Sequence, residues 1–163
     1  MNDIDATDTA QQNHIAELAG RFVPNPNIPI ESQLELTLFA LLVWGEARGE
    51  GWQGKLGVAH VAWTRYQART FGSTLENVIL RPLQFSCFNK NDPNRAKMLT
   101  VKNDAIWQEC FEAAWRVYRD DSIDPTGGAN HYCHFTSHPA WLEGMEQTCQ
   151  IGDHCFFRRR RVA

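Results

Sequence analysis

The carboxylates with the most suggestive spacing are Glu46 and Glu50, which stand four residues apart in GEARGE, where an apolar run over 38–44 gives way to glycines. On a helix, side chains at this spacing are neighbours, and two like charges there repel one another. Carboxylates near a helix C-terminus also face the negative end of the macrodipole. Because both effects oppose helix stability, the pair raises the question of a chemical role.

Glu46 has the stronger claim to such a role, as a general acid. If the helix persists, its side chain shares a face with three apolar residues, Phe39, Leu42 and Val43. Loss of solvation on that face favours the neutral carboxylic acid, which can donate a proton. The residues alone leave a simpler alternative open, in which Glu46 ends the helix and pairs with Arg48 or Lys55 in solvent.

Four helices are expected to position these groups. Three are predicted over residues 33–48, 52–68 and 100–120. A fourth, shorter helix opens at the capping-box pattern of residues 73–76 and is stopped by Pro82. Ser32 and Glu35 have the spacing of a capping box at the start of the first helix. The expected buried face of the last helix consists of Ile106, Cys110, Phe111, Ala114 and Val117.

Residues 84–94 and the C-terminal quarter show loop, turn and strand signals instead of helical periodicity. Residues 84–94 have the composition of a loop, and DPTGGAN at 124–130 is a strong turn signal. The stretches HYCHF and DHCFF that follow the turn suit brief strands. The pattern therefore predicts an α+β fold that is predominantly helical, with a small C-terminal β element.

The 163 residues suit one domain with flanking segments. Residues 1–31 are polar and then proline-containing, which predicts an extended arm, with the folded part beginning near Ser32. We expect the domain to cover residues 32–158 and a basic tail to cover 159–163. The arginine run Arg158–Arg161 is either a solvated terminus or a contact with an anionic envelope surface.

Charge and hydropathy exclude several classes of protein. Sixteen Lys plus Arg against nineteen Asp plus Glu give a net charge of −3, so no nucleic-acid partner is expected. A signal-peptide pattern does not open the sequence, and its apolar runs are far shorter than the roughly 20 residues that span a bilayer. These observations predict synthesis in the cytoplasm without a signal peptide.

Four blocks, at 44–65, 78–88, 124–141 and 151–158, together resemble the SleB/CwlJ cell-wall hydrolase family, known from spore cortex-lytic enzymes and phage endolysins. They read WGEARGEGWQGKLGVAHVAWTR, VILRPLQFSCF, DPTGGANHYCHFTSHPAW and IGDHCFFR. The resemblance implies a lysozyme/lytic-transglycosylase-like domain that cleaves peptidoglycan glycan strands. It implies Glu46 as the catalytic acid/base, and neither a cofactor nor a metal.

The implied reaction is lytic transglycosylation between N-acetylmuramic acid and N-acetylglucosamine, with a 1,6-anhydro product. The first alternative is a muramidase that hydrolyses the same bond, and the second is a non-catalytic glycan-binding or virion structural module. We expect a monomeric phage endolysin that is released through a holin and acts on peptidoglycan in the periplasm or cell wall.

Further side chains in the same blocks are expected to bind substrate or support the site. They are Glu50, Gln84, Phe85, Ser86, Thr126, Gly127, Gly128, Tyr132 and Trp141. Gln84 and Ser86 can hydrogen-bond sugar groups, while Tyr132 can orient Glu46 or stack on a ring. Phe85 and Trp141 fit a core position as well as a substrate contact, and the two glycines fit a turn equally well.

Five cysteines, Cys87, Cys110, Cys133, Cys149 and Cys155, include no CxxC pair. Their spacing, with nearby histidines, does not match a zinc motif, and plain packing is the main expectation. A disulfide that joins two of the last three stays open, since oxidation after release would permit it. A cysteine peptidase or amidase is disfavoured, because no cysteine has a histidine partner that the spacing singles out.

Overall fold

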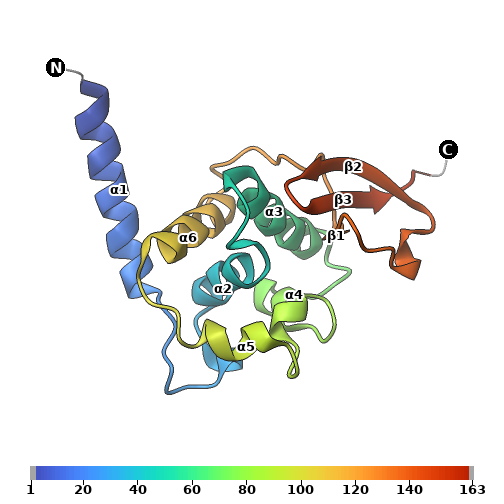
Figure 1. The fold of residues 1–163 in the computed structure, drawn as a ribbon, viewed down its shortest axis with the longest axis horizontal. Helices are drawn as coiled ribbons and strands as arrows, with labels where there is room; N and C mark the ends of the chain where they lie inside the picture. The colour runs from blue at the N-terminus through green and yellow to red at the C-terminus, as the bar shows by residue number, and fades with distance from the viewer. Residues whose placement is uncertain (1–2, 162–163) are drawn as a thin grey trace.

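The computed structural model describes residues 3–161, with side chains from residue 6 onward. The helices are α1 (Asp3–Arg21), α2 (Glu35–Ala47), α3 (Trp52–Ala68), α4 (Leu75–Leu80), α5 (Pro93–Met98) and α6 (Ala105–Tyr118). Three single-turn 3₁₀ helices are η1 (Ile30–Ser32), η2 (Ser86–Phe88) and η3 (Ala140–Leu142). The strands are β1 (His131–His134), β2 (Met145–Ile151) and β3 (His154–Arg159). The expected mainly helical α+β class is confirmed (Figure 1).

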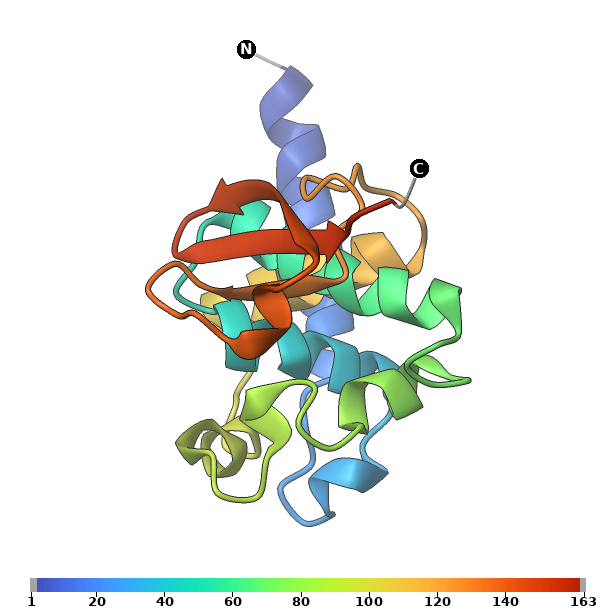
Figure 2. The same ribbon diagram turned by 90° about the vertical axis from the view of Figure 1, so that its right-hand side faces the viewer.

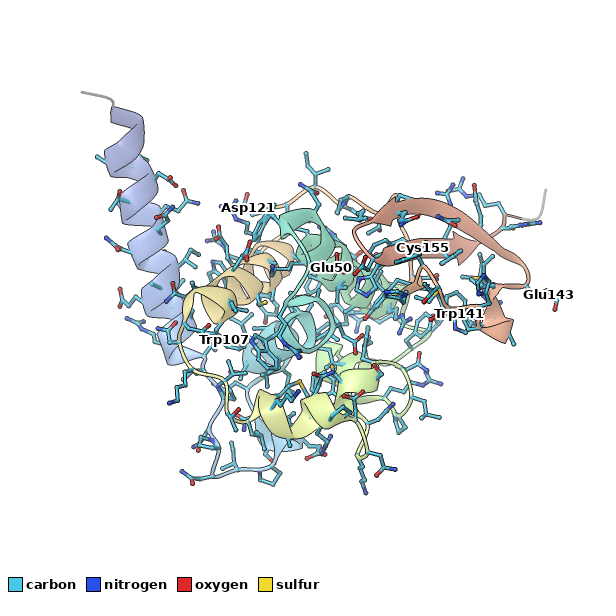
Figure 3. All side chains as sticks on the ribbon, viewed as in Figure 1. Glu50, Trp107, Asp121, Trp141, Glu143 and Cys155 are labelled. Atoms are coloured by element: carbon cyan, nitrogen blue, oxygen red, sulfur yellow. The ribbon has the colours of Figure 1, made fainter. Side chains whose placement is uncertain are left out.

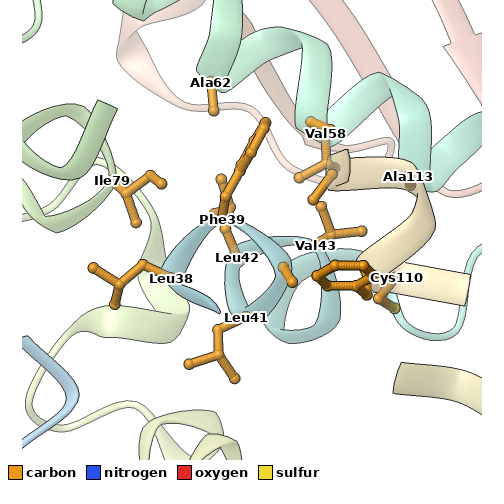
Figure 4. Close-up of a cluster of buried hydrophobic side chains, with 14 of the residues drawn as sticks. Leu38, Phe39, Leu41, Leu42, Val43, Val58, Ala62, Ile79, Cys110 and Ala113 are labelled. Atoms are coloured by element: carbon orange, nitrogen blue, oxygen red, sulfur yellow. The ribbon is translucent and has the colours of Figure 1, made fainter. Parts of the chain in front are cut away.

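Helix α2 forms the centre of the core. Its residues from 36 to 43 are all buried, and α3, α4, α5 and α6 pack around it (Figure 4). A helix that is apolar on every side is stable only when it is covered on every side. Leu38 and Leu42 are fully buried, as are Val58 of α3 and Cys110 of α6, which lie in the same cluster. The last turn of α2, which carries Glu46, is therefore fixed by the core beneath it.

The sheet is antiparallel with the order β1-β3-β2, and it lies at the opposite end of the molecule from α1 (Figures 1 and 2). Phe156 of β3 is fully buried where the sheet meets α3. A Cβ atom at Gly57 of α3 would lie 2.8 Å from the Phe156 ring, so this glycine permits the close approach of helix and strand. The sheet is thus docked on α3, next to the end of α2.

The N-terminal segment differs from the expected extended arm. Residues 3–21 form α1, which projects beyond the rest of the protein (Figure 1). Its second half joins the core through Ile15 and Ala19, and the carbonyl of Ala19 accepts a 2.9 Å hydrogen bond from Trp107 Nε1. The prediction that folding starts near Ser32 was therefore wrong, because Ile15, Leu18 and Ala19 anchor an otherwise polar helix. Residues 1 and 2 lie outside the described part.

Helix positions were predicted better than helix caps. The helix over 52–68 is confirmed, and the first expected helix, 33–48, is observed as Glu35–Ala47. The capping box was wrong, because Ser32 belongs to η1 and Leu34 precedes α2 without a side-chain cap. In α6 the predicted burial of Ile106 was also wrong. Its side chain is 49% exposed, and its neighbour Trp107 is buried instead.

Besides α1, the prediction missed α5, β2 and part of the structure of the tail. Helix α5 begins at the end of the expected loop 84–94, and β2 follows the first predicted strand. The arginine run does not begin as a free tail, since Arg158 and Arg159 belong to β3 and Arg158 pairs with Glu146 at 3.1 Å. Residues 162 and 163 lie outside the described part. Among the described helices, none has the length and apolar character needed to cross a bilayer.

Candidate active site

Three donors converge on the half-buried carboxylate of Glu46. Its Oε1 accepts hydrogen bonds from the backbone N–H of Cys87 (2.9 Å) and from Ser86 Oγ (3.2 Å). Its Oε2 accepts one from the phenolic hydroxyl of Tyr132 (2.9 Å). Both oxygens are therefore held in place by two chain segments that are remote in sequence, η2 and β1.

A helical glycine makes this arrangement possible. A Cβ atom at Gly45 would lie 2.7 Å from Cys87 Sγ, so only glycine lets η2 approach α2 this closely. The sequence alternative in which Glu46 pairs in solvent does not hold. Arg48 donates to Asn94 Oδ1 at 2.8 Å and lies over the Trp44 ring, while Lys55 pairs with Glu109 at 3.0 Å.

The Tyr132 hydroxyl is suited to remain protonated and to donate its hydrogen bond to Glu46. Burial, and then the neighbouring Glu46 carboxylate, raises the pKa of Tyr132 well above its usual value, so the phenol keeps its proton at neutral pH. Its ring lies 5.0 Å from His154 and 5.8 Å from Phe156. Of the two roles considered for Tyr132, the geometry matches the one that orients Glu46.

Glu50 has a different environment from Glu46, although both border one cavity. The Glu50 side chain is only 13% exposed, and its two oxygens lie 3.4 and 3.3 Å from the backbone N–H of Asp153. His154 Nδ1 lies 3.8 Å from Glu50 Oε1. A Cβ atom at Gly152 would collide with the Glu50 carboxylate at 1.8 Å. Glu50 therefore attaches the turn between β2 and β3 to the loop between α2 and α3.

A cavity of about 390 Å³ lies beside these groups. It is lined by Gly45, Glu46, Ala47, Arg48, Gly49, Glu50, Asn94, His134, Asp153 and His154. The lining is mostly polar and combines the end of α2 with α5 and the sheet. Such a concave polar surface beside a held carboxylate is a suitable place for a hydrophilic substrate.

Gln84 and Phe85 do not hydrogen-bond to Glu46, and both contact the buried Arg65 instead. The Arg65 guanidinium is buried, lies 4.9 Å from the Phe71 and Phe85 rings, and donates to Gln84 Oε1 at 3.4 Å. Its Nε donates to the carbonyl of Asn130 at 2.7 Å, just before β1. Because Phe85 is 2% exposed, it cannot offer a stacking surface to a sugar, and it packs in the core instead.

Thr126, Gly127 and Gly128 form the expected turn. Thr126 is buried, and Asp124 accepts hydrogen bonds from the backbone N–H groups of Thr126 and Gly128 at 2.8 and 2.9 Å. The glycines have φ of +67° and +80°, which explains the residue type without a ligand. None of these three residues borders the cavity at Glu46.

Trp141 also lies apart from Glu46. Its ring is 5.0 Å from His131 and 5.6 Å from Phe157, and Figure 3 shows it at the outer end of the sheet, away from Glu50. It borders a separate cavity of about 490 Å³. Of the predicted supporting residues, the structure therefore gathers Glu50, Ser86 and Tyr132 around Glu46, and leaves Trp141 elsewhere.

Several site residues were missed by sequence reasoning. The backbone N–H of Cys87 carries no sequence signal, since any residue supplies one. Arg65 was detectable in principle, because it is a charged residue on the apolar spacing of α3. No sequence signal separates His154 from the neighbouring histidines, yet its Nδ1 lies 3.8 Å from Glu50 Oε1 and its ring lies 5.0 Å from the Tyr132 ring. Among the described residues, no three His, Cys, Asp or Glu side chains gather as a metal site.

A family model described as Cell Wall Hydrolase matches residues 49–157, more than half of the chain. The chain belongs to the cell wall hydrolase family. Glu50 lies inside the matched range of this family, and Glu46 lies three residues before it. The expected resemblance to the SleB/CwlJ group is confirmed by named relatives.

A spore cortex-lytic enzyme of Oceanobacillus iheyensis is 32% identical over 82% of this chain and 45% of its own length. One of Bacillus cereus is 31% identical over 91% of this chain and 52% of its own length. This cell wall hydrolase thus spans about half the length of the curated relatives that it matches.

Two solved structures have a similar fold. The catalytic domain of the Bacillus cereus SleB protein matches with a TM-score of 0.62 and 26% identity, over 76% of this chain and 89% of that one. The catalytic domain of the germination-specific lytic transglycosylase SleB from Bacillus anthracis matches with a TM-score of 0.61 and 26% identity, over 76% and 93%. These matches confirm the expected lysozyme/lytic-transglycosylase-like fold.

Proposed function

We propose that this chain cleaves the glycan strands of peptidoglycan between N-acetylmuramic acid and N-acetylglucosamine, by lytic transglycosylation. The observation that carries the proposal is the Glu46 carboxylate, held by three donors at the edge of a polar cavity. Family membership and the names of the relatives, spore cortex-lytic enzymes and a lytic transglycosylase, support the same class of substrate.

In the proposed mechanism the two oxygens of Glu46 have separate tasks, which the hydrogen-bond pattern supports. Oε1 accepts from both Ser86 and Cys87, so its lone pairs are engaged on the side of η2. Oε2 has one partner, Tyr132, and is the oxygen free to carry the catalytic proton. In the first step this proton passes to the bridging oxygen as the C1–O bond breaks, and positive charge develops on the muramic ring.

The second step uses the same side chain as a base. The ionised Glu46 accepts the proton of the 6-hydroxyl of the muramic residue, and that oxygen forms a bond to C1. The product carries a 1,6-anhydro ring, and Glu46 is again a carboxylic acid. The three donors stabilise the intermediate carboxylate, which is a benefit of fixed dipoles aimed at developing charge.

Glu50 is assigned to positioning rather than to proton transfer. It holds the β2–β3 turn through Asp153, and the sheet in turn carries Tyr132. Its burial and its contact with His154 keep it directed at the sheet. This assignment extends the sequence-based prediction that Glu50 supports or tunes Glu46.

Hydrolysis by a muramidase is the second candidate, because other carboxylates border the cavity. Glu50 and the exposed Asp153 both line it, and a second carboxylate can activate water. A non-catalytic glycan-binding or structural module is the remaining candidate, and it predicts no cleavage at all.

The products of digestion distinguish these candidates. Purified protein is incubated with peptidoglycan sacculi, and the released fragments are identified by mass spectrometry. Transglycosylation gives 1,6-anhydro ends, which are lighter by one water than the reducing ends of hydrolysis. Reducing muramic ends would identify a muramidase, and intact sacculi would contradict both enzymatic proposals.

The proposed biological role is host lysis as a phage endolysin released through a holin. The resemblance of the four sequence blocks to a family that includes endolysins supports it. Co-expression with a holin in a bacterial host should cause lysis, whereas expression of either protein alone should not. Lysis without the holin would contradict holin-dependent release.

A further inference from the structure

Three cysteines lie in the small sheet, one on each strand. Cys133 of β1 and Cys155 of β3 are direct Cα partners in the antiparallel register. Cys149 of β2 is opposite Phe156 and not opposite either cysteine. All five cysteines of the chain are free thiols in the structure.

The register places these thiols on different faces of the sheet. Directly opposed residues of an antiparallel pair point to the same face, and successive residues point to opposite faces. Cys133 and Cys155 accordingly lie in one apolar cluster with Met145 and Phe157, on the face away from α3. Cys149 packs with Phe156 in the cluster that faces α3.

Spacing allows one cysteine pair and excludes the others. Opposed Cα atoms in antiparallel strands are about 4.5–5.5 Å apart, which lies within the roughly 4.4–6.8 Å that a disulfide spans. Cys149 and Cys133 are separated by the whole of β3, and Cys149 and Cys155 point to opposite faces. We propose that Cys133 and Cys155 form a cross-strand disulfide when the folded protein meets an oxidising disulfide.

The reaction is thiol–disulfide exchange with a small disulfide such as oxidised glutathione. Cys133 is the more exposed of the two, so its thiolate attacks first and releases one glutathione thiol. The buried Cys155 then attacks the mixed disulfide and releases the second. The protein loses two hydrogens, and one molecule of oxidised glutathione becomes two of reduced glutathione.

A disulfide between Cys133 and Cys155 would restrain β1, the strand that orients the Glu46 carboxylate. Among the described strands, β1 is an edge strand that pairs with β3 alone, and it presents Tyr132 to Glu46 from the residue next to Cys133. A covalent bond to β3 therefore restrains the segment that orients the carboxylate. The inference rests on the register of the sheet and does not depend on the proposed reaction.

The test is oxidation of the purified full chain with excess oxidised glutathione at pH 8.5, followed by intact mass and peptide mapping. The proposal predicts a loss of two hydrogens and a single linked peptide pair that contains Cys133 and Cys155. It also predicts a Tm for the oxidised protein about 5 °C above that of the reduced protein.

Two serine variants act as matched controls. Cys133→Ser should abolish both the mass loss and the rise in Tm, and its partly exposed position makes it tolerable to folding. Cys149→Ser should retain both. A link that involves Cys149, a glutathione adduct that persists on Cys133, or unreacted thiols after prolonged oxidation would each overturn the proposal.

Discussion

The phenolic hydroxyl of Tyr132 donates a 2.9 Å hydrogen bond to Oε2 of Glu46, a residue 86 positions earlier in the chain. This bond joins the edge strand of the sheet to the last turn of the central helix. It exists because Phe156 docks the sheet against Gly57 of α3. The position of the candidate acid therefore depends on the docking of the C-terminal sheet.

Replacing Tyr132 with phenylalanine tests this bond. The ring contacts with His154 and Phe156 are kept, so the sheet should stay docked and Tm should fall by only several degrees. Loss of one hydrogen bond to a charged group costs about 1.5–3 kcal/mol, which predicts roughly a 10- to 100-fold fall in kcat. The control is Tyr118→Phe, whose hydroxyl lies 3.5 Å from Glu35, away from the site. Equal activity of Tyr132→Phe and wild type would contradict the orienting role.

Gly45→Ala tests the approach of η2 to α2. The added methyl group would meet Cys87 Sγ at 2.7 Å and push the donors of η2 away from Glu46. We expect activity to fall at least about tenfold, which corresponds to the partial loss of two hydrogen bonds. Gly51→Ala is the control, because a Cβ atom there meets nothing within 4 Å. Retained activity in Gly45→Ala would show that the donors of η2 are dispensable.

Gly152→Ala tests the attachment of the β2–β3 turn by Glu50. Gly152 has φ of +56°, and a Cβ atom would lie 1.8 Å from Glu50 Oε2. Gly144→Ala is a matched control with φ of +79° and open space around the Cβ position. In each variant an alanine at positive φ lowers the free energy of unfolding by roughly 1–2 kcal/mol. The further fall in Tm of Gly152→Ala, relative to Gly144→Ala, therefore reports the clash with Glu50. Equal Tm values for the two variants would show that this contact is easily displaced.

The lowered pKa of His131 predicts that the stability of the folded protein depends on pH. Burial, and then the charges of Arg65 and Arg159, lowers the pKa of His131 from 6.5 to about 4. Between these values the unfolded chain binds more protons than the folded one, so stability falls as the pH falls from 6.5 to 4. His60 and His154, whose pKa values are also lowered by burial, act in the same direction.

The measurement is Tm against pH for wild type and His131→Asn. The variant should lose less Tm than wild type between pH 6.5 and pH 4, because one group that must remain neutral has been removed. The exposed His138 provides the control, and His138→Asn should follow the wild-type curve. Parallel curves for His131→Asn and wild type would contradict the assigned pKa.

Predictions from the sequence succeeded where apolar periodicity was strong. The helix over 52–68 was predicted with its observed bounds, and the buried face of α6 was correct at Cys110, Phe111 and Ala114. The prediction was wrong at Ile106, because an apolar residue type does not by itself fix the buried face, on which Trp107 lies instead. Helix α1 was missed because its sequence is mostly polar, and its core contacts come from one short stretch with Ile15, Leu18 and Ala19.

The candidate site was predictable in residue type but not in geometry. Glu46 was predicted from its position on an apolar helix face and from the family resemblance, and Ser86 and Tyr132 were predicted as side chains that can bind sugar groups or orient Glu46. Their convergence depends on the docking of separate elements, which local pattern does not report. Phe85 belonged to the same block, yet its burial follows from packing on Arg65 rather than from its own neighbours in sequence.

Glu46→Gln tests the central claim most directly, because the amide keeps the shape of the carboxylic acid and cannot donate an acidic proton. Release of soluble fragments from sacculi is measured for wild type, Glu46→Gln and Glu50→Gln, with Tm and sacculus binding determined for each. The account predicts that Glu46→Gln folds, binds sacculi and releases fragments at least about 1,000-fold more slowly, while Glu50→Gln keeps measurable activity. Wild-type release by folded Glu46→Gln would contradict the account.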